Sequence, residues 1–125
     1  MPNQHTEWLR SLIPLLGNYK GLRVLDVGCE VEGALVSSLK SDFEAKEAIG
    51  INPTVDNCVL ASGAHLLKGD ICKTTFEDCF FDLIISSCAF EHIQNLDLAL
   101  KEMHRILKPD GLLYSHHGPI WSTSY

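Results

Sequence analysis

Apolar residues along this chain follow two patterns: short unbroken runs, and longer stretches in which apolar side chains recur every three or four positions. An unbroken run bounded by turn residues is typical of a strand buried on both faces, whereas the second pattern predicts an amphipathic helix. The runs predict five strands, of which the longest is expected to be the central one. They cover residues 22–28, 45–52, 65–71, 80–90 and 112–117.

The helical spacing falls between these runs. Over the first 20 residues it predicts a packing or lid helix that ends near Gly17 and that Pro14 should kink or shorten. Residues 32–43 and 95–107 repeat the pattern, and a Lys-Pro-Asp-Gly turn follows the second of them. Residues 52–63 open with Asn-Pro-Thr, a helix-capping sequence, and predict a further short helix.

Strands and helices therefore alternate along the chain, without internal repeats or low-complexity tracts. Alternation of this kind implies right-handed crossovers and a mainly parallel sheet with helices on both faces. We expect a three-layer, doubly wound α/β domain with about five strands. A length of 125 residues fits one domain with a substantial core.

Composition and charge limit the partners that this chain is expected to bind. Apolar residues make up 46% and charged residues 21%, as in folded globular proteins. The formal net charge is -6 and the ten basic residues are scattered, which disfavours nucleic-acid binding. The apolar runs are too short to cross a bilayer and the polar start lacks a secretion signal, so we expect a cytoplasmic protein without a membrane partner.

Five cysteines and six histidines raise the question of a metal site. The cysteines form no C-x-x-C pair, and the adjacent His116 and His117 would point to opposite faces of a strand. We therefore expect free thiols and no metal site.

Polar residues gather at the ends of four of the predicted strands. In a doubly wound sheet, ligands bind beyond the carboxyl ends of the strands, so these positions are the candidates for a binding site. They are residues 26–33, Asn52 and Pro53, Asp70 and Ile71, and residues 86–92.

The same segments resemble, in order, the signatures of class I S-adenosylmethionine-dependent methyltransferases, in particular the branch related to ubiquinone-biosynthesis enzymes. The resemblance spans residues 22–114 and rests on "VLDVGC", "AIGIN", "KGDI", "FDLIISSCAFEHI" and "ALKEMHRILKPDGLL". Its most specific part is "FDLI" followed by "EH" and "LKPDGLL" at this distance. It implies a single methyltransferase-like domain over residues 1–125, with an N-terminal helix over residues 1–20 and a Rossmann-like core over residues 21–125.

The resemblance also implies which residues hold the cofactor, S-adenosylmethionine. Asp26 and Gly28 would hold its methionine part, with the backbone of Cys29 close by. Asn52, followed by Pro53, stands where the family usually has an acidic residue that binds both ribose hydroxyls.

Later positions would bind the rest of the cofactor. Asp70 would accept a hydrogen bond from the adenine amino group, and Ile71 would pack on the ring. Ser87 and Cys88 would line the far side of the cofactor, whose transfer product is S-adenosylhomocysteine.

The substrate space is expected beside Phe90, Glu91 and His92. Methyl transfer from a sulfonium is an in-line displacement, so much of the acceleration can come from orientation, and a catalytic base is not obligatory. If the acceptor is a hydroxyl group, His92 is the titratable residue that we expect to act as base. A cofactor without phosphate needs close backbone approach rather than an anion cradle, which argues against NAD.

The chain departs from the family pattern in the glycine loop. Glu30 and Glu32 stand where the second and third glycines are usual, and Gly33 can replace the third only if the turn is one residue longer. A non-glycine residue is disfavoured where φ must be positive, and Glu30 would bring a carboxylate near the cofactor. Asn52 would bind ribose without the charge-assisted strength of a carboxylate.

The family's sheet normally has two more strands after the fifth, one of them antiparallel, and these are expected to be missing here. The fifth strand would then be an open edge. Another copy of the chain in a homodimer, the N-terminal helix or a segment missing from this sequence could cover it.

Two functions of different classes follow from these observations. The first is S-adenosylmethionine-dependent methyl transfer to a small-molecule or sugar-related acceptor. The alternative is a non-catalytic scaffold or partner subunit of the same fold, with weakened or lost cofactor binding. A nicotinamide-dependent oxidoreductase fits the glycine spacing least well.

Overall fold

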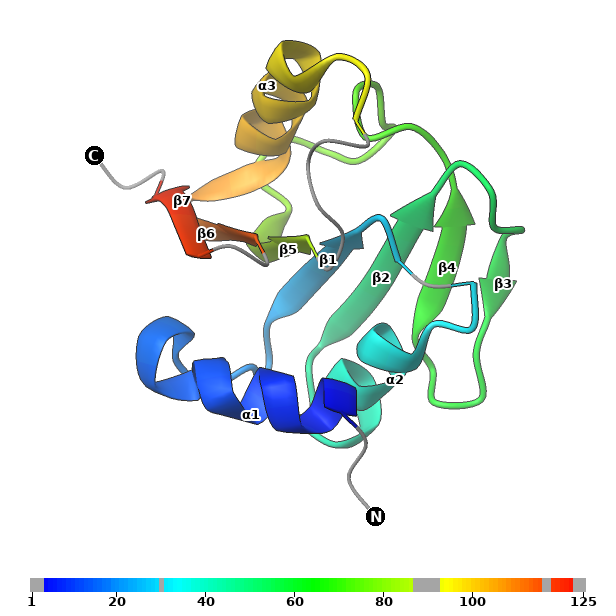
Figure 1. Cartoon of the computed structure of the whole chain (residues 1–125), viewed down its shortest axis with the longest axis vertical. Helices are drawn as coiled ribbons and strands as arrows, with labels where there is room; N and C mark the ends of the chain where they lie inside the picture. The colour runs from blue at the N-terminus through cyan, green and yellow to red at the C-terminus, as the bar shows by residue number, and fades with distance from the viewer. Residues whose placement is uncertain (1–3, 30, 87–92, 116–117, 123–125) are drawn as a thin grey trace.

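The fold is a single twisted sheet with helices on both faces, seen in a computed structural model that describes residues 4–29, 31–86, 93–115 and 118–122 (Figure 1). The helices are α1 (Gln4–Leu16), α2 (Ala34–Ser41) and α3 (Leu96–Ile106). The strands are β1 (Arg23–Val27), β2 (Glu47–Asn52), β3 (Cys58–Val59), β4 (His65–Lys68), β5 (Phe81–Ser86), β6 (Leu107–Ser115) and β7 (Gly118–Ser122). None of the helices in this described part is long and apolar enough to cross a membrane.

The strand order is β3-β4-β2-β1-β5-β6-β7. The five strands from β4 to β6 pair in parallel, while the two outer strands are antiparallel to their neighbours. The chain steps from β1 outward to β2 and β4, and then returns to place β5 on the other side of β1. The predicted α/β class is confirmed, and the topological switch lies between β1 and β5. The central position belongs to β1 and not, as expected, to the strand from residues 80–90.

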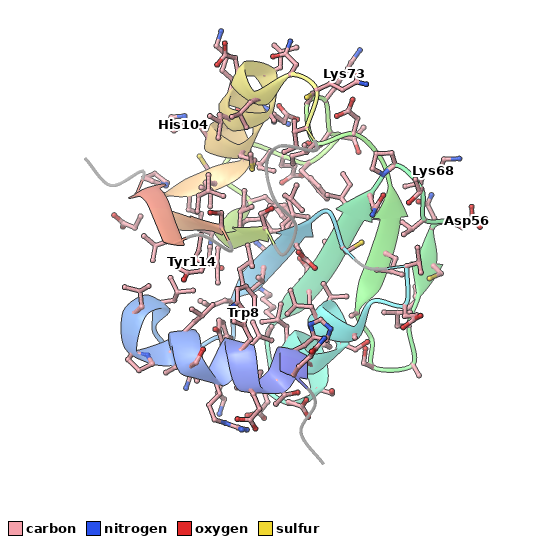
Figure 2. The ribbon with its side chains drawn as sticks, viewed as in Figure 1. Trp8, Asp56, Lys68, Lys73, His104 and Tyr114 are labelled. Atoms are coloured by element: carbon pink, nitrogen blue, oxygen red, sulfur yellow. The ribbon has the colours of Figure 1, made fainter. Side chains whose placement is uncertain are left out.

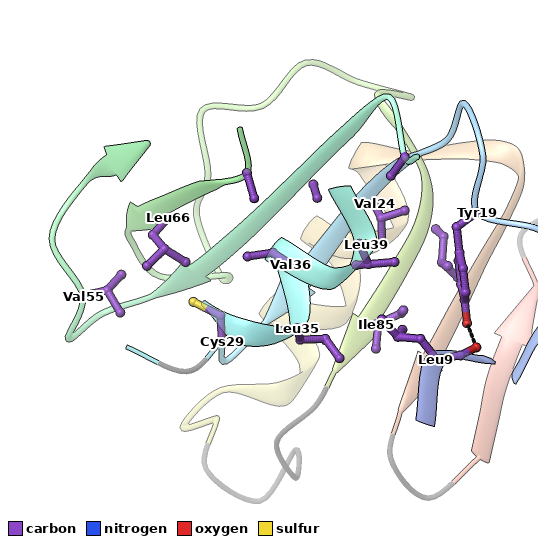
Figure 3. Packing of buried hydrophobic residues seen from close by; sticks show 14 residues of the cluster. Leu9, Tyr19, Val24, Cys29, Leu35, Val36, Leu39, Val55, Leu66 and Ile85 are labelled. Atoms are coloured by element: carbon purple, nitrogen blue, oxygen red, sulfur yellow. Dashed lines mark hydrogen bonds between the residues drawn. The ribbon is translucent and has the colours of Figure 1, made fainter. Parts of the chain in front are cut away.

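Two apolar clusters lie on opposite faces of the sheet, which gives the three layers. Leu35 and Leu39 of α2 pack with Val24 of β1 in one cluster, shown in Figure 3. Met103 of α3 packs with the adjacent β1 residue Leu25 in the other. Successive residues of β1 thus enter different clusters, which explains why an unbroken apolar run marks this strand.

Helix α1 is a packing helix. Leu9 is fully buried, and its carbonyl oxygen accepts a hydrogen bond from the Tyr19 hydroxyl at 2.5 Å (Figure 3). Trp8 contacts Tyr114 of β6, with ring centroids 6.3 Å apart (Figure 2). The helix continues through Pro14 to Leu16, so the proline does not shorten it, although no N–H is present at this position to bond within the helix.

The helix predicted over residues 52–63 is wrong. The Asn52 side chain accepts a hydrogen bond from the backbone N–H of Thr54 at 2.9 Å, which forms a turn instead of a helix cap. Strand β3 follows and pairs antiparallel with β4 through a tight connection closed by the Leu60 N–H to Ala64 carbonyl bond at 2.8 Å. The Cys-Val pair of β3 has the β-forming character that the capping argument overlooked.

The expected open edge at the fifth predicted strand is also wrong. Strand β7 pairs antiparallel with β6, from Leu112 opposite Ser122 to Ser115 opposite Gly118. The sheet therefore has seven strands among the described residues, and a dimer through the β6 edge loses its physical reason. β6 begins directly after α3, and the Lys-Pro-Asp-Gly turn forms a bulge within it, because the register passes from Phe81–Leu107 to Leu83–Leu112.

Candidate functional site

A cavity of about 620 Å³ opens at the carboxyl ends of β1, β2, β4 and β5, beside the start of α3. This volume is in the range of small-molecule and cofactor sites, and the position is the one expected for a ligand in a doubly wound sheet. Its lining brings together five of the residues predicted to hold the cofactor, Gly28, Asn52, Pro53, Asp70 and Ile71. The other lining residues are Val27, Ile51, Thr54, Gly69, Cys72, Ser86, Ile93, Gln94, Asn95 and Leu98.

In the turn after β1, Gly28 exposes its backbone to the cavity, because a glycine has no side chain. Gly28 has a φ of 79°, in the left-handed region that glycine tolerates best. The N–H groups of Gly28 and Cys29 both donate to the carbonyl of Ile51, at 2.9 and 3.4 Å. Cys29 is 2% exposed, and its Cβ and Sγ occupy the space above Gly50, where an added Cβ would lie 2.7 and 2.8 Å from them. The thiol of Cys29 therefore belongs to the core, and Cys29 is not among the residues that line the cavity, so its predicted backbone contact with the cofactor stays a prediction.

The start of α2 contains one of the glycines of the loop, Gly33. Gly33 is the N-cap residue of this helix, with φ 68°, and a Cβ there would lie 2.5 Å from Leu60 Cδ1. It is therefore the glycine that the helix start requires, one residue later than the usual third glycine. The Glu32 side chain is exposed, whereas Glu30 lies outside the described residues.

Asn52 lines the cavity, and its amide group holds two neighbouring turns. The Nδ2 group donates to the Cys29 carbonyl at 2.7 Å. The Oδ1 atom accepts from the backbone N–H and from the hydroxyl group of Thr54, both at 2.9 Å. Ribose binding by this residue stays a prediction.

The exit of β4 supplies a carboxylate next to an apolar surface. Asp70 Oδ1 accepts from the Cys72 N–H at 2.9 Å, which fixes a short turn. Ile71 is 6% exposed and packs in the same cluster as Val27 and Ile51, so the cavity has an apolar floor. Cys72 donates its thiol to the Asn95 carbonyl at 3.3 Å, and its pKa is raised by burial and by the neighbouring Asp70.

Asp26 is fully buried within β1, opposite Gly50 on one side and Ile85 on the other. By strand alternation its side chain lies on the face of Val24, which α2 covers, whereas Val27 faces the cavity. Asp26 is thus buried on the α2 side of the sheet, and it is not among the residues that line the cavity. Its predicted role toward the methionine part of a cofactor stays a prediction.

Other predicted positions follow β5. Ser86, the last residue of this strand, lines the cavity and donates from its hydroxyl to the Val27 carbonyl at 3.4 Å. The remaining positions predicted from the sequence lie outside the described residues. They are Ser87, Cys88, Phe90, Glu91 and His92; His116 and His117, for which no metal site was expected, lie outside them as well.

Several residues of the site were not predicted from the sequence. Thr54 directly follows Asn52 and Pro53, and its adjacency to them was a usable signal. Asn95 was expected to begin α3, and the structure shows it as the N-cap, accepting from the Leu98 N–H at 3.1 Å. Its carbonyl contact with a cysteine 23 residues earlier could not be predicted from spacing.

A charged network fixes the segment that leaves the cavity. Glu102 of α3 accepts from the N–H and hydroxyl groups of Thr74, at 2.7 and 2.6 Å, and from Arg105 at 2.8 Å. Arg105 also binds Asp78 at 2.6 Å. The bonds from Arg105 and Thr74 outweigh the effect of burial and lower the pKa of Glu102 to about 2. The segment between Ile71 and β5 is thereby attached to α3.

A mainly parallel sheet with a cavity at its topological switch, of the size that a small-molecule cofactor fills, defines a Rossmann-like domain. The family model described as "Methyltransferase domain" matches residues 25–115, which is most of the chain. The chain belongs to this family of S-adenosylmethionine-dependent methyltransferases, and S-adenosylmethionine is the family's cofactor. The resemblance seen in the sequence is confirmed.

Individual relatives agree with this assignment. A demethylmenaquinone methyltransferase from Staphylococcus aureus is 27% identical over 117 residues, which cover 88% of this chain and 48% of that protein. The chain therefore spans about half the length of the curated relatives it matches.

Solved structures show the shared fold. A Methanococcus maripaludis protein, provisionally assigned as an S-adenosyl-L-methionine-dependent methyltransferase, matches with a TM-score of 0.74 at 20% identity, covering 89% of this chain and 54% of that one. An S-adenosylmethionine-dependent methyltransferase from Aquifex aeolicus matches with a TM-score of 0.68 at 20% identity, covering 90% and 62%.

Proposed function

We propose that this chain binds S-adenosylmethionine in the cavity at the carboxyl ends of β1, β2, β4 and β5, and that it serves methyl transfer to a small-molecule acceptor. The observation that carries the proposal is the meeting of Gly28, Asn52, Asp70 and Ile71 in one cavity. These residues come from three strand ends that are far apart in the sequence, and each strand end was expected to contact a different part of the cofactor.

The shape and chemistry of the cavity fit this cofactor. Gly28 permits close approach of a ligand to the backbone, because no side chain stands at that position. Ile71, with Val27 and Ile51, supplies an apolar surface for a flat ring. Asp70 uses one oxygen to hold its own turn, and a carboxylate has further acceptor capacity for an amino group.

The charge of the cavity fits a cationic ligand better than a phosphorylated one. Its lining, among the described residues, includes the carboxylate of Asp70 and no lysine or arginine. A dinucleotide pyrophosphate would meet no cationic side chain there, whereas a cofactor without phosphate needs none. This supports S-adenosylmethionine over NAD.

The cofactor would supply a methyl group activated on a sulfonium. The protein's part would be to hold an acceptor in line with the bond that breaks, and to exclude water. For a hydroxyl acceptor, His92 is our proposed proton acceptor, because in the sequence it comes after β5 and directly before Ile93, which lines the cavity. The similarity to a demethylmenaquinone methyltransferase supports a small-molecule acceptor, and a sugar-related one is the second candidate.

Calorimetric titration with S-adenosylmethionine and S-adenosylhomocysteine tests the proposal. Asp70→Ala should weaken binding about tenfold, since it removes a hydrogen bond from a charged acceptor. Asp56→Ala is the matched control, because this exposed aspartate lies in the turn after β2 and outside the cavity lining. Absence of binding to the wild-type chain at millimolar ligand would refute the proposal and favour the non-catalytic scaffold.

A further inference from the structure

The side chain of Asn52 joins the glycine turn after β1 to the turn after β2. Its Nδ2 group donates to the Cys29 carbonyl at 2.7 Å, and its Oδ1 atom accepts from Thr54 N–H and Oγ1 at 2.9 Å. We call this set of hydrogen bonds the Asn52 bridge. It connects two segments that both border the cavity.

The backbone partners of the bridge fix its chemistry. A carbonyl oxygen can only accept a hydrogen bond and a backbone N–H can only donate one, so the amide has a single orientation that satisfies Cys29 and Thr54 together. A carboxylate at this position could still accept from Thr54. It would, however, place a charged oxygen 2.7 Å from the Cys29 carbonyl oxygen, in place of a donor.

The glycine turn depends on β2 for its position. The N–H groups of Gly28 and Cys29 both bond to the Ile51 carbonyl, and the Cys29 side chain fills the space above Gly50. The Asn52 bridge holds the Cys29 carbonyl from the next residue of the same strand. The turn is thus attached to three successive residues of β2, and Gly28 lies at the cavity as a result.

We propose that Asn52 is a positioning residue that holds the glycine turn against β2, and that this chain requires a carboxamide there rather than a carboxylate. The position is the one at which the family resemblance predicts an acidic ribose ligand, and the carboxamide here has a structural task that a carboxylate could not perform. The bridge itself is a property of the fold, whereas its effect on cofactor affinity rests on the proposed function.

Thiol alkylation of Cys29 measures the bridge without any ligand, because this thiol is 2% exposed and reacts only when the turn opens. Labelling is followed by mass spectrometry of the peptide that contains it. Asn52→Asp should accelerate labelling about tenfold or more, and Asn52→Ala by a smaller factor, because only the first adds repulsion.

Asn57→Asp is the matched control in the neighbouring turn. Asn57 uses its Oδ1 atom to accept from the Lys68 N–H at 2.7 Å, a bond that an aspartate can keep. Labelling of Cys29 in this variant should equal that of the wild type. Equal labelling in all variants would overturn the proposal.

Backbone amide exchange at Ile84, a fully buried residue of β5, separates local opening from global unfolding. The proposal expects Asn52→Asp to accelerate Cys29 labelling far more than exchange at Ile84. Equal acceleration at both positions would show that Asn52 stabilises the whole fold, and would overturn the specific role. If the Asn52→Asp variant does not fold, the same comparison of Cys29 labelling with amide exchange at Ile84 is made on Asn52→Ala.

Titration with S-adenosylhomocysteine tests the consequence for the site. S-adenosylhomocysteine should bind more weakly to Asn52→Asp than to Asn57→Asp, because displacement of the glycine turn changes the shape of the cavity. Tighter binding to Asn52→Asp would mean that a ribose-binding acid is preferred, and would overturn the requirement for an amide. If the wild type does not bind at all, the proposed function fails, while the labelling experiment still decides on the bridge.

Discussion

Glu102 and Thr74 are 28 residues apart in the sequence, yet one carboxylate oxygen of Glu102 accepts from both the backbone N–H and the hydroxyl group of Thr74. Arg105 binds the same carboxylate from one turn further along α3. Because this side chain is only 12% exposed, its hydrogen bonds are little screened by solvent. The contact attaches the segment after the cavity to α3, together with the Arg105–Asp78 ion pair and the backbone bond from the Cys79 N–H to the Arg105 carbonyl.

The network predicts an acid-dependent loss of stability. The pKa of Glu102 is lowered from 4.5 to about 2, so its contribution is fully present above about pH 4.5 and is lost as the pH falls toward 2. Glu102→Gln should lower the free energy of unfolding by about 2 kcal/mol at pH 7, and this difference should shrink in acid. Denaturant titrations between pH 2 and pH 7 measure it.

Glu77→Gln is the control for this prediction, since the side chain of Glu77 is exposed in the same segment. Its free energy of unfolding should follow that of the wild type at every pH. A pH-independent difference for Glu102→Gln would mean that the carboxylate charge does not contribute.

The start of α2 gives a second prediction about stability. Gly33→Ala combines a left-handed φ of 68° with a Cβ that would lie 2.5 Å from Leu60 Cδ1, so we expect a loss of about 2–3 kcal/mol. Gly21→Ala has a similar φ of 77° but no neighbour within 4 Å, and should cost about 1 kcal/mol. Equal losses in the two variants would show that the contact with Leu60 is relieved at no cost.

Much of the fold could be predicted because the strands between β4 and β6 are buried on both faces. Val24 and Leu25 enter opposite clusters, and this produces the unbroken apolar runs that the sequence shows. The site residues after β1, β2 and β4 could be placed for a related reason, since parallel strands bring their carboxyl ends to one edge.

Other features of the fold and the site are determined by long-range contacts and could not be predicted from the local sequence. Asn52 can cap a helix or form a turn with Thr54, and the second is favoured here because its amide also reaches Cys29. The outer strand β3 has only two residues, and the pairing of β3 and β7 depends on neighbours that periodicity does not identify. The Thr74 contact of Glu102 is a long-range one, whereas the pair of Glu102 with Arg105 follows helical spacing and could have been found.

Cys72 provides a chemical probe of the cavity. Its thiol donates to the Asn95 carbonyl, and burial followed by the nearby Asp70 raises its pKa, so less thiolate is present at a given pH. Alkylation at pH 8 should therefore be slower at Cys72 than at Cys58, which is exposed on β3. Asp70→Asn should accelerate the alkylation of Cys72, because it removes the negative charge beside the thiol. The alkylation rate of Cys58 should not change. Saturating S-adenosylhomocysteine should protect Cys72 alone, and equal protection of both thiols would contradict binding in this cavity.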